Sequence, residues 1–235
     1  MSTFSANLFA ILLELVCTFL LTYTHLATHA TPAAMGICLW FCGLIAGRIS
    51  GAHVNPAVTL AFMLRPKERR LNCLTGLFFI LFQVCGSFIA GLMYWWANYN
   101  GAKLHGYDFT RSNLWFGSLF LEVGGPFCFT LIILMNTDQE ARLAQEDWAV
   151  YLMIGASLAL ATMWARGVSG AVFNPAFAVG VDLAAIISGA SSKILEKIWI
   201  YIACPIGGAL LALLYHNFVY KAATDGGDEK QALLS

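Results

Sequence analysis

Two short stretches of the chain carry amide side chains at positions that could bind a small hydrogen-bonding solute. Residues 50–57 read Ser-Gly-Ala-His-Val-Asn-Pro-Ala, and residues 169–176 read Ser-Gly-Ala-Val-Phe-Asn-Pro-Ala. Asn is a favoured helix N-cap because its side-chain oxygen accepts a backbone N–H, and Pro is favoured at the first helical position. Each stretch therefore predicts a helix start with an amide group at its tip. The residues are Asn55, Pro56 and Ala57 in the first stretch and Asn174, Pro175 and Ala176 in the second.

The surrounding sequence is that of a membrane protein. Hydrophobic residues make up 59% of the 235 residues and charged residues 11%, with a mean hydropathy of +0.72, whereas about a quarter of the residues in a soluble domain are charged. The net charge is zero and no basic run is long enough to indicate nucleic-acid binding. The seven cysteines lie mostly in apolar segments without the paired spacing of a zinc site. We therefore expect a polytopic protein in a lipid bilayer, with neither a metal nor a cofactor.

The two predicted helix starts interrupt this apolar sequence, and a broken backbone at membrane depth is tolerated only where it is buried in protein or lines a wet cavity. The first helix can run over 56–65 before Pro66 stops it, which is roughly 15 Å at the standard rise. That length is about half of the hydrocarbon thickness of a bilayer. Two such half-helices, the second over 175–187, would meet near the midplane if they entered from opposite faces, and the pair predicts a channel.

This pair of stretches resembles the duplicated Asn-Pro-Ala signature of the aquaporin (major intrinsic protein) family. One Asn-Pro-Ala is a weak signal, but both copies follow Ser-Gly at the same distance and each follows two apolar spans. The resemblance covers about 7–220. It implies a single channel domain over 1–235, an all-α membrane protein of six transmembrane helices and two re-entrant half-helices, and a homotetramer with one pore per subunit.

The apolar segments fit this architecture. We expect spans at about 7–23 or slightly beyond, 33–49, 71–96, 114–135, 148–165 and 194–220, and a short loop containing His25 and His29 after the first span. Phe-Leu-Glu-Val around Glu122 repeats Leu-Glu-Leu around Glu14. Together with the two signatures, this indicates an internal repeat over about 7–97 and 114–220, followed by a tail at 221–235. Three spans per repeat place the second repeat upside down in the membrane, as an inverted repeat.

Glu14 and Glu122 are ionisable residues inside predicted spans, which by default is a functional hypothesis. The alternative is structural, because a carboxylate can accept several N–H groups from buried loop backbone. The resemblance implies this second role, as a pair of buried structural acids.

Charge predicts the orientation. The densest positive cluster lies at 65–70 and is expected to face the cytoplasm by the positive-inside rule. The connector at 97–113 would then be external, the charged loop at 136–147 cytoplasmic, and both termini cytoplasmic. The tail at 229–234 fits an acidic dileucine sorting signal, with a disordered polar end as the alternative. We expect the plasma membrane or a vacuolar or endosomal membrane.

The pore chemistry follows from the half-helices. Each contributes the positive end of its dipole, roughly half an elementary charge, and two such ends at the midplane help to exclude protons and other cations. The Asn55 and Asn174 amides can donate to a passing oxygen, so a water held by both cannot continue a proton wire. Backbone carbonyls of the preceding stretches are expected to act as acceptors along the pore. These pore carbonyls belong to Gly51, Ala52, His53, Gly170 and Val172.

The resemblance also implies an outer selectivity constriction of four residues. Carried over by distance from the signatures, they are Met35, Thr162, Ala171 and Phe177. Phe177 stands where the family usually has Arg, which puts strict water selectivity in doubt. Three alternatives remain open: Phe177 and Met35 form a hydrophobic gate, a wider apolar mouth admits glycerol, urea, ammonia or hydrogen peroxide, or Arg166 replaces the missing cation. Asp182, in the second half-helix, would pair with Arg166 or with a polar neighbour.

We therefore predict a passive transmembrane channel for water, with small neutral solutes as further candidates. Enzymatic activity is not expected, because no nucleophile, base and orienting group share a plausible site. An ion-coupled transporter would need a charged midplane site, and Asn55 and Asn174 are neutral. The remaining alternative is a poorly conducting membrane structural or adhesion protein with the same fold, and Phe177 is the residue that favours it.

Overall fold

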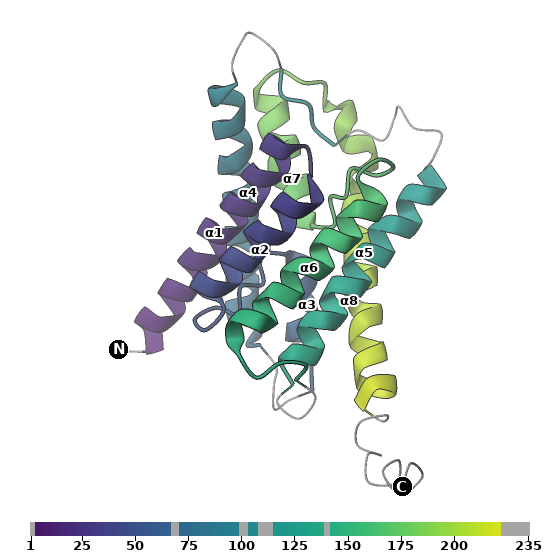
Figure 1. The fold of residues 1–235 in the computed structure, drawn as a ribbon. Helices are drawn as coiled ribbons and strands as arrows, with labels where there is room; N and C mark the ends of the chain where they lie inside the picture. The colour runs from purple at the N-terminus through teal and green to yellow at the C-terminus, as the bar shows by residue number, and fades with distance from the viewer. Residues whose placement is uncertain (1–2, 67–70, 99–102, 108–114, 139–141, 222–235) are drawn as a thin grey trace, which may run out of the picture.

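The computed structural model describes residues 3–66, 71–98, 103–107, 115–138 and 142–221. Within these ranges the chain is helical and contains no strand. The helices are α1 (Thr3–Thr28), α2 (Pro32–Ala46), α3 (Pro56–Met63), α4 (Cys73–Ala97), α5 (Trp115–Asn136), α6 (Asp147–Ala165), α7 (Pro175–Ile187) and α8 (Ile198–Tyr215), shown in Figure 1. A 3₁₀ segment (Ser192–Lys197) precedes α8 and a π-helical turn (His216–Tyr220) follows it.

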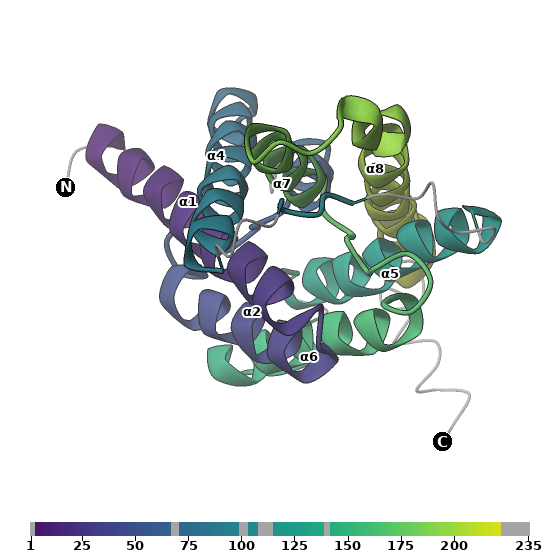
Figure 2. The same cartoon turned by 90° about the horizontal axis from the view of Figure 1, so that it is seen from above.

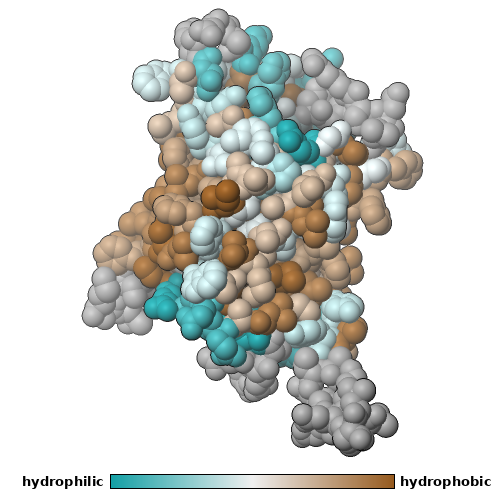
Figure 3. All heavy atoms as spheres, viewed as in Figure 1, coloured by the Kyte–Doolittle hydropathy of each residue, from teal (hydrophilic) through white to brown (hydrophobic). Residues whose placement is uncertain are grey.

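Membrane-length helices account for most of the fold. Among the described residues, five helical segments are long and apolar enough to cross a membrane: Leu8–Thr28, Cys73–Ala97, Trp115–Asn136, Asp147–Ala165 and Ser192–Tyr220. Helix α2 has 15 residues. The bonds from Ser50 N to Ala46 O (2.8 Å) and from Gly51 N to Gly47 O (3.2 Å) continue its helical pattern toward a full span. Apolar surface is gathered at mid-height in Figure 3, with polar patches toward both ends.

Two predicted boundaries are wrong. The first half-helix ends at Met63 rather than at about residue 65; Arg65 instead donates to Leu134 O of α5 (3.3 Å) and to the hydroxyl of Thr137, which directly follows α5 (2.9 Å). The first span, expected to end at residue 23 or slightly beyond, continues to Thr28, so His25 lies inside the helix and not in the expected loop. Polar residues at the end of a span resemble a loop in sequence, but Thr28 bonds back to its own helix and adds no break.

The bundle is built from two similar halves. Helix α1 packs on α4 and α5 packs on α8, and each pair approaches closely at a glycine. A Cβ on Gly86 would collide with the backbone at Leu15, and a Cβ on Gly208 would collide with the backbone at Val123. Leu15 and Val123 each directly follow one of the two buried glutamates. The matched contacts give the inverted repeat its structural basis, while its limits at 7–97 and 114–220 stay predictions.

The half-helices lie between these pairs. Helix α3 packs against α8 and α4, and α7 packs against α4 and α8; Figure 2 shows α7 between α4 and α8. Figure 1 shows α3 in the lower half of the bundle and α7 in the upper half, so their N-termini meet in the middle. Helices α2 and α6 close the opposite side, where Gly36 and Gly155 bring the two backbones together.

The two ends of the bundle differ in what they carry. The N-terminus of α1 and the C-terminus of α8 lie toward the lower end of the bundle in Figure 1, which we call the terminal end. The opposite end, here the far end, carries the turn between α1 and α2 and the C-terminus of α7. Lys67, Arg69 and Arg70 of the predicted positive cluster lie outside the described residues, as does the predicted sorting tail at 229–234.

Candidate functional site at the meeting of two half-helices

Asn55 and Asn174 begin the two half-helices as their sequence predicts. The Oδ1 atom of Asn55 accepts from Ala57 N at 2.9 Å, and that of Asn174 accepts from Ala176 N at 3.0 Å. Both asparagines have extended backbone, and a proline follows each at the first helical position. These caps satisfy backbone N–H groups that would otherwise be orphaned at a helix start.

The same two side chains tie the half-helices together. Asn55 Nδ2 donates to the carbonyl of Phe173 at 3.0 Å, and Asn174 Nδ2 donates to the carbonyl of Val54 at 2.8 Å. Each bond therefore ends on the residue that directly precedes the other asparagine. Since a side-chain amide has two N–H donors, each asparagine keeps a second hydrogen for the cavity that both of them line.

The backbone before each asparagine repeats an unusual conformation. The φ angles are +90° at Gly51, +47° at Ala52 and +45° at Val54, and the equivalent residues Gly170, Ala171 and Phe173 have +85°, +53° and +55°. Left-handed φ is strained for residues other than glycine, and for a β-branched residue such as Val54 it is a clear outlier. Both stretches must therefore be held in place by contacts from elsewhere.

Glu14 supplies those contacts in the first half. Its side chain is fully buried on α1. Its carboxylate accepts from the backbone N–H groups of His53 (2.9 Å) and Val54 (2.7 Å), from the Ser50 hydroxyl (2.6 Å) and from Gln83 Nε2 (2.8 Å). The carboxylate thus accepts from backbone N–H groups of a strained loop that is not part of a helix or a sheet. It does not line the central cavity.

Glu122 does the same in the second half. Fully buried on α5, it accepts from Val172 N (3.0 Å), Phe173 N (2.7 Å) and the Ser169 hydroxyl (2.6 Å). The matching partners support the structural role that the resemblance implies for both acids.

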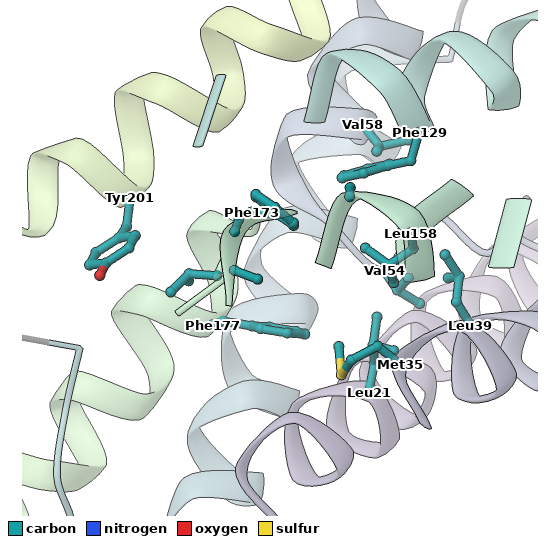
Figure 4. Close-up of a cluster of buried hydrophobic side chains, with 14 of the residues drawn as sticks. Leu21, Met35, Leu39, Val54, Val58, Phe129, Leu158, Phe173, Phe177 and Tyr201 are labelled. Atoms are coloured by element: carbon teal, nitrogen blue, oxygen red, sulfur yellow. The ribbon is translucent and has the colours of Figure 1, made fainter. Parts of the chain in front are cut away.

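A central cavity of about 20 Å³ lies at the meeting point. One water needs roughly 10–15 Å³, so the cavity has water-sized dimensions. Apart from His53 and the two asparagines, its walls are apolar. Side chains shown in Figure 4 that line it are Leu21, Met35, Leu39, Val54, Val58, Phe129, Leu158, Phe173 and Phe177.

Three of the four predicted constriction residues meet at this cavity. Met35, Ala171 and Phe177 line it and are buried, with Phe177 only 1% exposed; in Figure 4 the Phe177 ring points toward Met35. Thr162 is buried but does not line the cavity, because its hydroxyl turns back to donate to Leu158 O at 2.7 Å. Leu158, one turn earlier on the same helix face, lines the wall instead.

The predicted pore carbonyls separate into three groups. His53 and Val172 belong to the central cavity. Gly51 and Ala52 instead line a smaller cavity of about 10 Å³, shared with Tyr151 and other residues of α2, α5 and α6. The Gly170 carbonyl faces the side chain of His25, which the sequence pattern places in a loop.

His25 is a site residue that sequence reasoning missed. Its Nε2 lies 3.1 Å from Gly170 O and 3.3 Å from Ala171 O, and its Nδ1 lies 3.0 Å from the hydroxyl of Tyr107. Because carbonyls can only accept, we assign the hydrogen to Nε2, so that Nδ1 accepts from Tyr107. The available signal was helical spacing, since His25 follows Leu21, which lines the cavity, by four residues.

Asp182 holds Tyr107 in position. Fully buried on α7, it accepts from Tyr107 N at 2.8 Å, and Ser188 farther along the helix accepts from Leu104 N at 2.9 Å. The polar neighbour expected for Asp182 is thus the backbone of the connector. Arg166 is exposed at the C-terminus of α6 and does not line the central cavity, so the structure does not place it as a substitute for the missing arginine.

Among the described residues, no group of three or more His, Cys, Asp or Glu side chains is arranged to hold a metal ion. The described lining of the central cavity consists of the two amides, the imidazole of His53 and apolar residues.

Known proteins are similar to this chain in sequence and in fold. The family model described as Major intrinsic protein matches residues 28–216. A probable aquaporin, PIP1-5 of Arabidopsis thaliana, is 30% identical over 89% of this chain and 78% of its own. A glycerol uptake facilitator protein-like 6 of Lactiplantibacillus plantarum is 32% identical over 86% of this chain and 93% of its own. The aquaglyceroporin structure from Plasmodium falciparum has a TM-score of 0.76 at 16% identity, covering 93% of this chain and 99% of that one, which shows a shared fold.

Proposed function

Because this chain belongs to the major intrinsic protein family, we propose that it is a passive transmembrane channel for water that excludes protons and ions. The observation that carries the proposal is the pair of crossed asparagine bonds beside a water-sized cavity. Asn55 and Asn174 each have a second amide N–H that can donate to a solute in the cavity. A water that accepts from both has its lone pairs engaged and cannot accept a proton from the next water.

The barrier to cations rests on the half-helices. Among the described residues, no Lys, Arg, Asp or Glu lines the central cavity. The N-terminal ends of α3 and α7 both point at the cavity and each carries roughly half a positive charge. Two such ends disfavour a cation at the same point.

The cavity also bears on the range of solutes. Its volume of about 20 Å³ suits water and solutes of similar size, such as ammonia and hydrogen peroxide. Glycerol and urea would require Phe177 and Met35 to move apart. We therefore place water first among the permeants.

Osmotic shrinkage of proteoliposomes, followed by stopped flow, tests this function. Wild type, Phe177→Arg and the uncharged control Phe177→Leu are compared with protein-free vesicles, and proton leak and glycerol uptake are read on the same preparations. Fast shrinkage by wild type without proton leak is the expected result. Shrinkage at the protein-free rate, restored by Phe177→Arg, would instead favour the poorly conducting structural or adhesion protein.

Assembly and orientation extend the same proposal. We propose a homotetramer with one pore per subunit and with both termini in the cytoplasm, in a plasma, vacuolar or endosomal membrane. Large apolar side chains exposed along the helices, such as Phe120 and Phe41, offer surface for lipid or for neighbouring subunits. Cross-linking in vesicles tests the oligomer, and a Leu233→Ala/Leu234→Ala variant that stays in place would reject sorting by the tail.

A further inference from the structure

Three aromatic side chains form a layer at the far end of the pathway. The ring centroid of His25 lies 5.5 Å from that of Phe177 and 5.5 Å from that of Tyr107, and both pairs meet edge to face. We call His25, Tyr107 and Phe177 the mouth layer. They come from three separate parts of the chain: α1, the connector at 103–107 and α7.

The mouth layer lies between the central cavity and the open surface of the far end. On one side, Leu21 and Phe177 line the central cavity. On the other, Leu26 of α1 and Leu104 of the connector line a surface cavity of about 260 Å³. Among the cavities found in the described residues, these two share no lining residue. Along α1, His25 lies between Leu21 and Leu26, and Tyr107 of the connector contacts His25 through its hydroxyl.

We propose that His25 and Tyr107 are specificity-determining residues of this channel, and that Asp182 positions Tyr107 across the mouth. The inference rests on the proposed function and names the groups that select the solute. His25, Tyr107 and Asp182 do not belong to the constriction set that the family resemblance implies. Within the mouth layer, His25 is hydrogen-bonded to the carbonyls of Gly170 and Ala171, and the Tyr107 hydroxyl is hydrogen-bonded to His25. The ring of Phe177 supplies an apolar wall beside His25.

The selection follows from hydrogen-bond exchange. In the closed layer, the Tyr107 hydroxyl donates to His25 Nδ1 across 3.0 Å. A water that enters between them can accept from the hydroxyl and donate to the imidazole, so one bond is replaced by two. A polyol must shed several water contacts at once, and the layer can replace few of them. Because an unreplaced hydrogen bond is costly, the layer favours water over glycerol.

Asp182 makes the layer rigid. It lies five residues after Phe177 on α7, so one half-helix carries both an aromatic wall and the anchor of the opposing ring. The connector lies tightly on this helix, since a Cβ on Gly106 would contact Asp182 Oδ1. Loss of the bond from Tyr107 N to Asp182 would let the Tyr107 ring move, while His25, Tyr107 and Phe177 all remain present.

Glycerol and water permeability of proteoliposomes, measured on the same vesicles, test the inference. Removing the phenol ring with Tyr107→Ala is expected to raise the ratio of glycerol to water permeability by about tenfold, the effect of sparing one unreplaced hydrogen bond. Asp182→Ala should shift the ratio in the same direction. Asp182→Asn keeps an acceptor oxygen for Tyr107 N and should restore the wild-type ratio.

Tyr94→Ala is the matched control. Tyr94 also lines the 260 Å³ surface cavity, but it lies outside the mouth layer, with its ring centroid 6.1 Å from that of Tyr23. Its loss should leave the ratio of glycerol to water permeability unchanged. If Tyr107→Ala and Asp182→Ala keep the wild-type ratio in vesicles that conduct water, the inference is overturned and the proposed function stands. If wild type and every variant conduct water no faster than protein-free vesicles, the proposed function fails, and this inference with it.

Discussion

Replacing Glu14 by Ala should be among the most destabilising single changes in the chain. It removes the acceptor of two buried backbone N–H groups, those of His53 and Val54, and of two side-chain donors. An orphaned buried donor costs about 1–3 kcal/mol, so the two backbone groups alone give roughly 2–6 kcal/mol. The strained φ of Val54 also loses its support.

Glu14→Gln should cost less, for a geometric reason. One carboxylate oxygen accepts from Ser50 and His53, and the other accepts from Val54 and Gln83. A glutamine can keep an oxygen toward one pair only, and its NH₂ then faces the donors of the other pair. We expect about half of the loss seen with Ala.

Thermal unfolding of the purified protein in detergent measures both changes. For a chain of this size, about 2–4 °C of melting temperature corresponds to each kcal/mol. Glu14→Ala should therefore lower the midpoint by roughly 4–24 °C, Glu14→Gln by an intermediate amount, and the exposed control Glu196→Gln by almost nothing. The reasoning is refuted if Glu14→Ala unfolds within a degree or two of Glu196→Gln.

Other changes test other parts of the structure. Asn55→Ala removes a helix cap worth about 1 kcal/mol and loosens the tie to the second half-helix, so proton leak through proteoliposomes should rise; a leak equal to wild type would contradict the role of the crossed bonds. Gly208→Ala forces α5 and α8 apart and should cost about 1–3 kcal/mol, whereas Gly207→Ala, which meets nothing within 4 Å, is its neutral control in the same unfolding assay. Tyr201→Phe removes a bond to Ser169 O (2.9 Å) and should cost about 0.5–1.5 kcal/mol; an unchanged midpoint would show that this bond contributes nothing.

Local sequence signals were sufficient for the half-helix starts. Asn-Pro specifies a cap and a first helical residue by itself, so α3 begins at Pro56 and α7 begins at Pro175, as the pattern predicts. The end of α3 depended on Pro66, which permits a helix up to Arg65 but does not require one. Arg65 leaves the helix because its guanidinium finds acceptors on α5, a contact that no local pattern reveals.

The mouth of the site was less predictable because its parts come from distant segments. His25 occupies the last turn of α1, where a polar residue looks like the start of a loop. Tyr107 is held in place by the hydrogen bond from its backbone N–H to the Asp182 carboxylate, 75 positions away in sequence. The place of Thr162 in an outer constriction stays a prediction; at the central cavity Leu158, one turn earlier on the same helix face, is the residue that lines the wall.

The crossed bonds between the half-helices have the geometry of a two-fold dimer. The amide of each half reaches the carbonyl just before the amide of the other, which is the reciprocal pattern of an isologous interface. Neither asparagine can change alone without leaving a buried carbonyl of the opposite half unpaired. The two halves are therefore equivalent at the asparagines, whereas the neighbouring side chains differ: His53 corresponds to Val172, and Val54 corresponds to Phe173. The crossed bonds use only the backbone carbonyls of Val54 and Phe173, so they require a symmetric backbone and two amides but set no such requirement on the adjacent side chains.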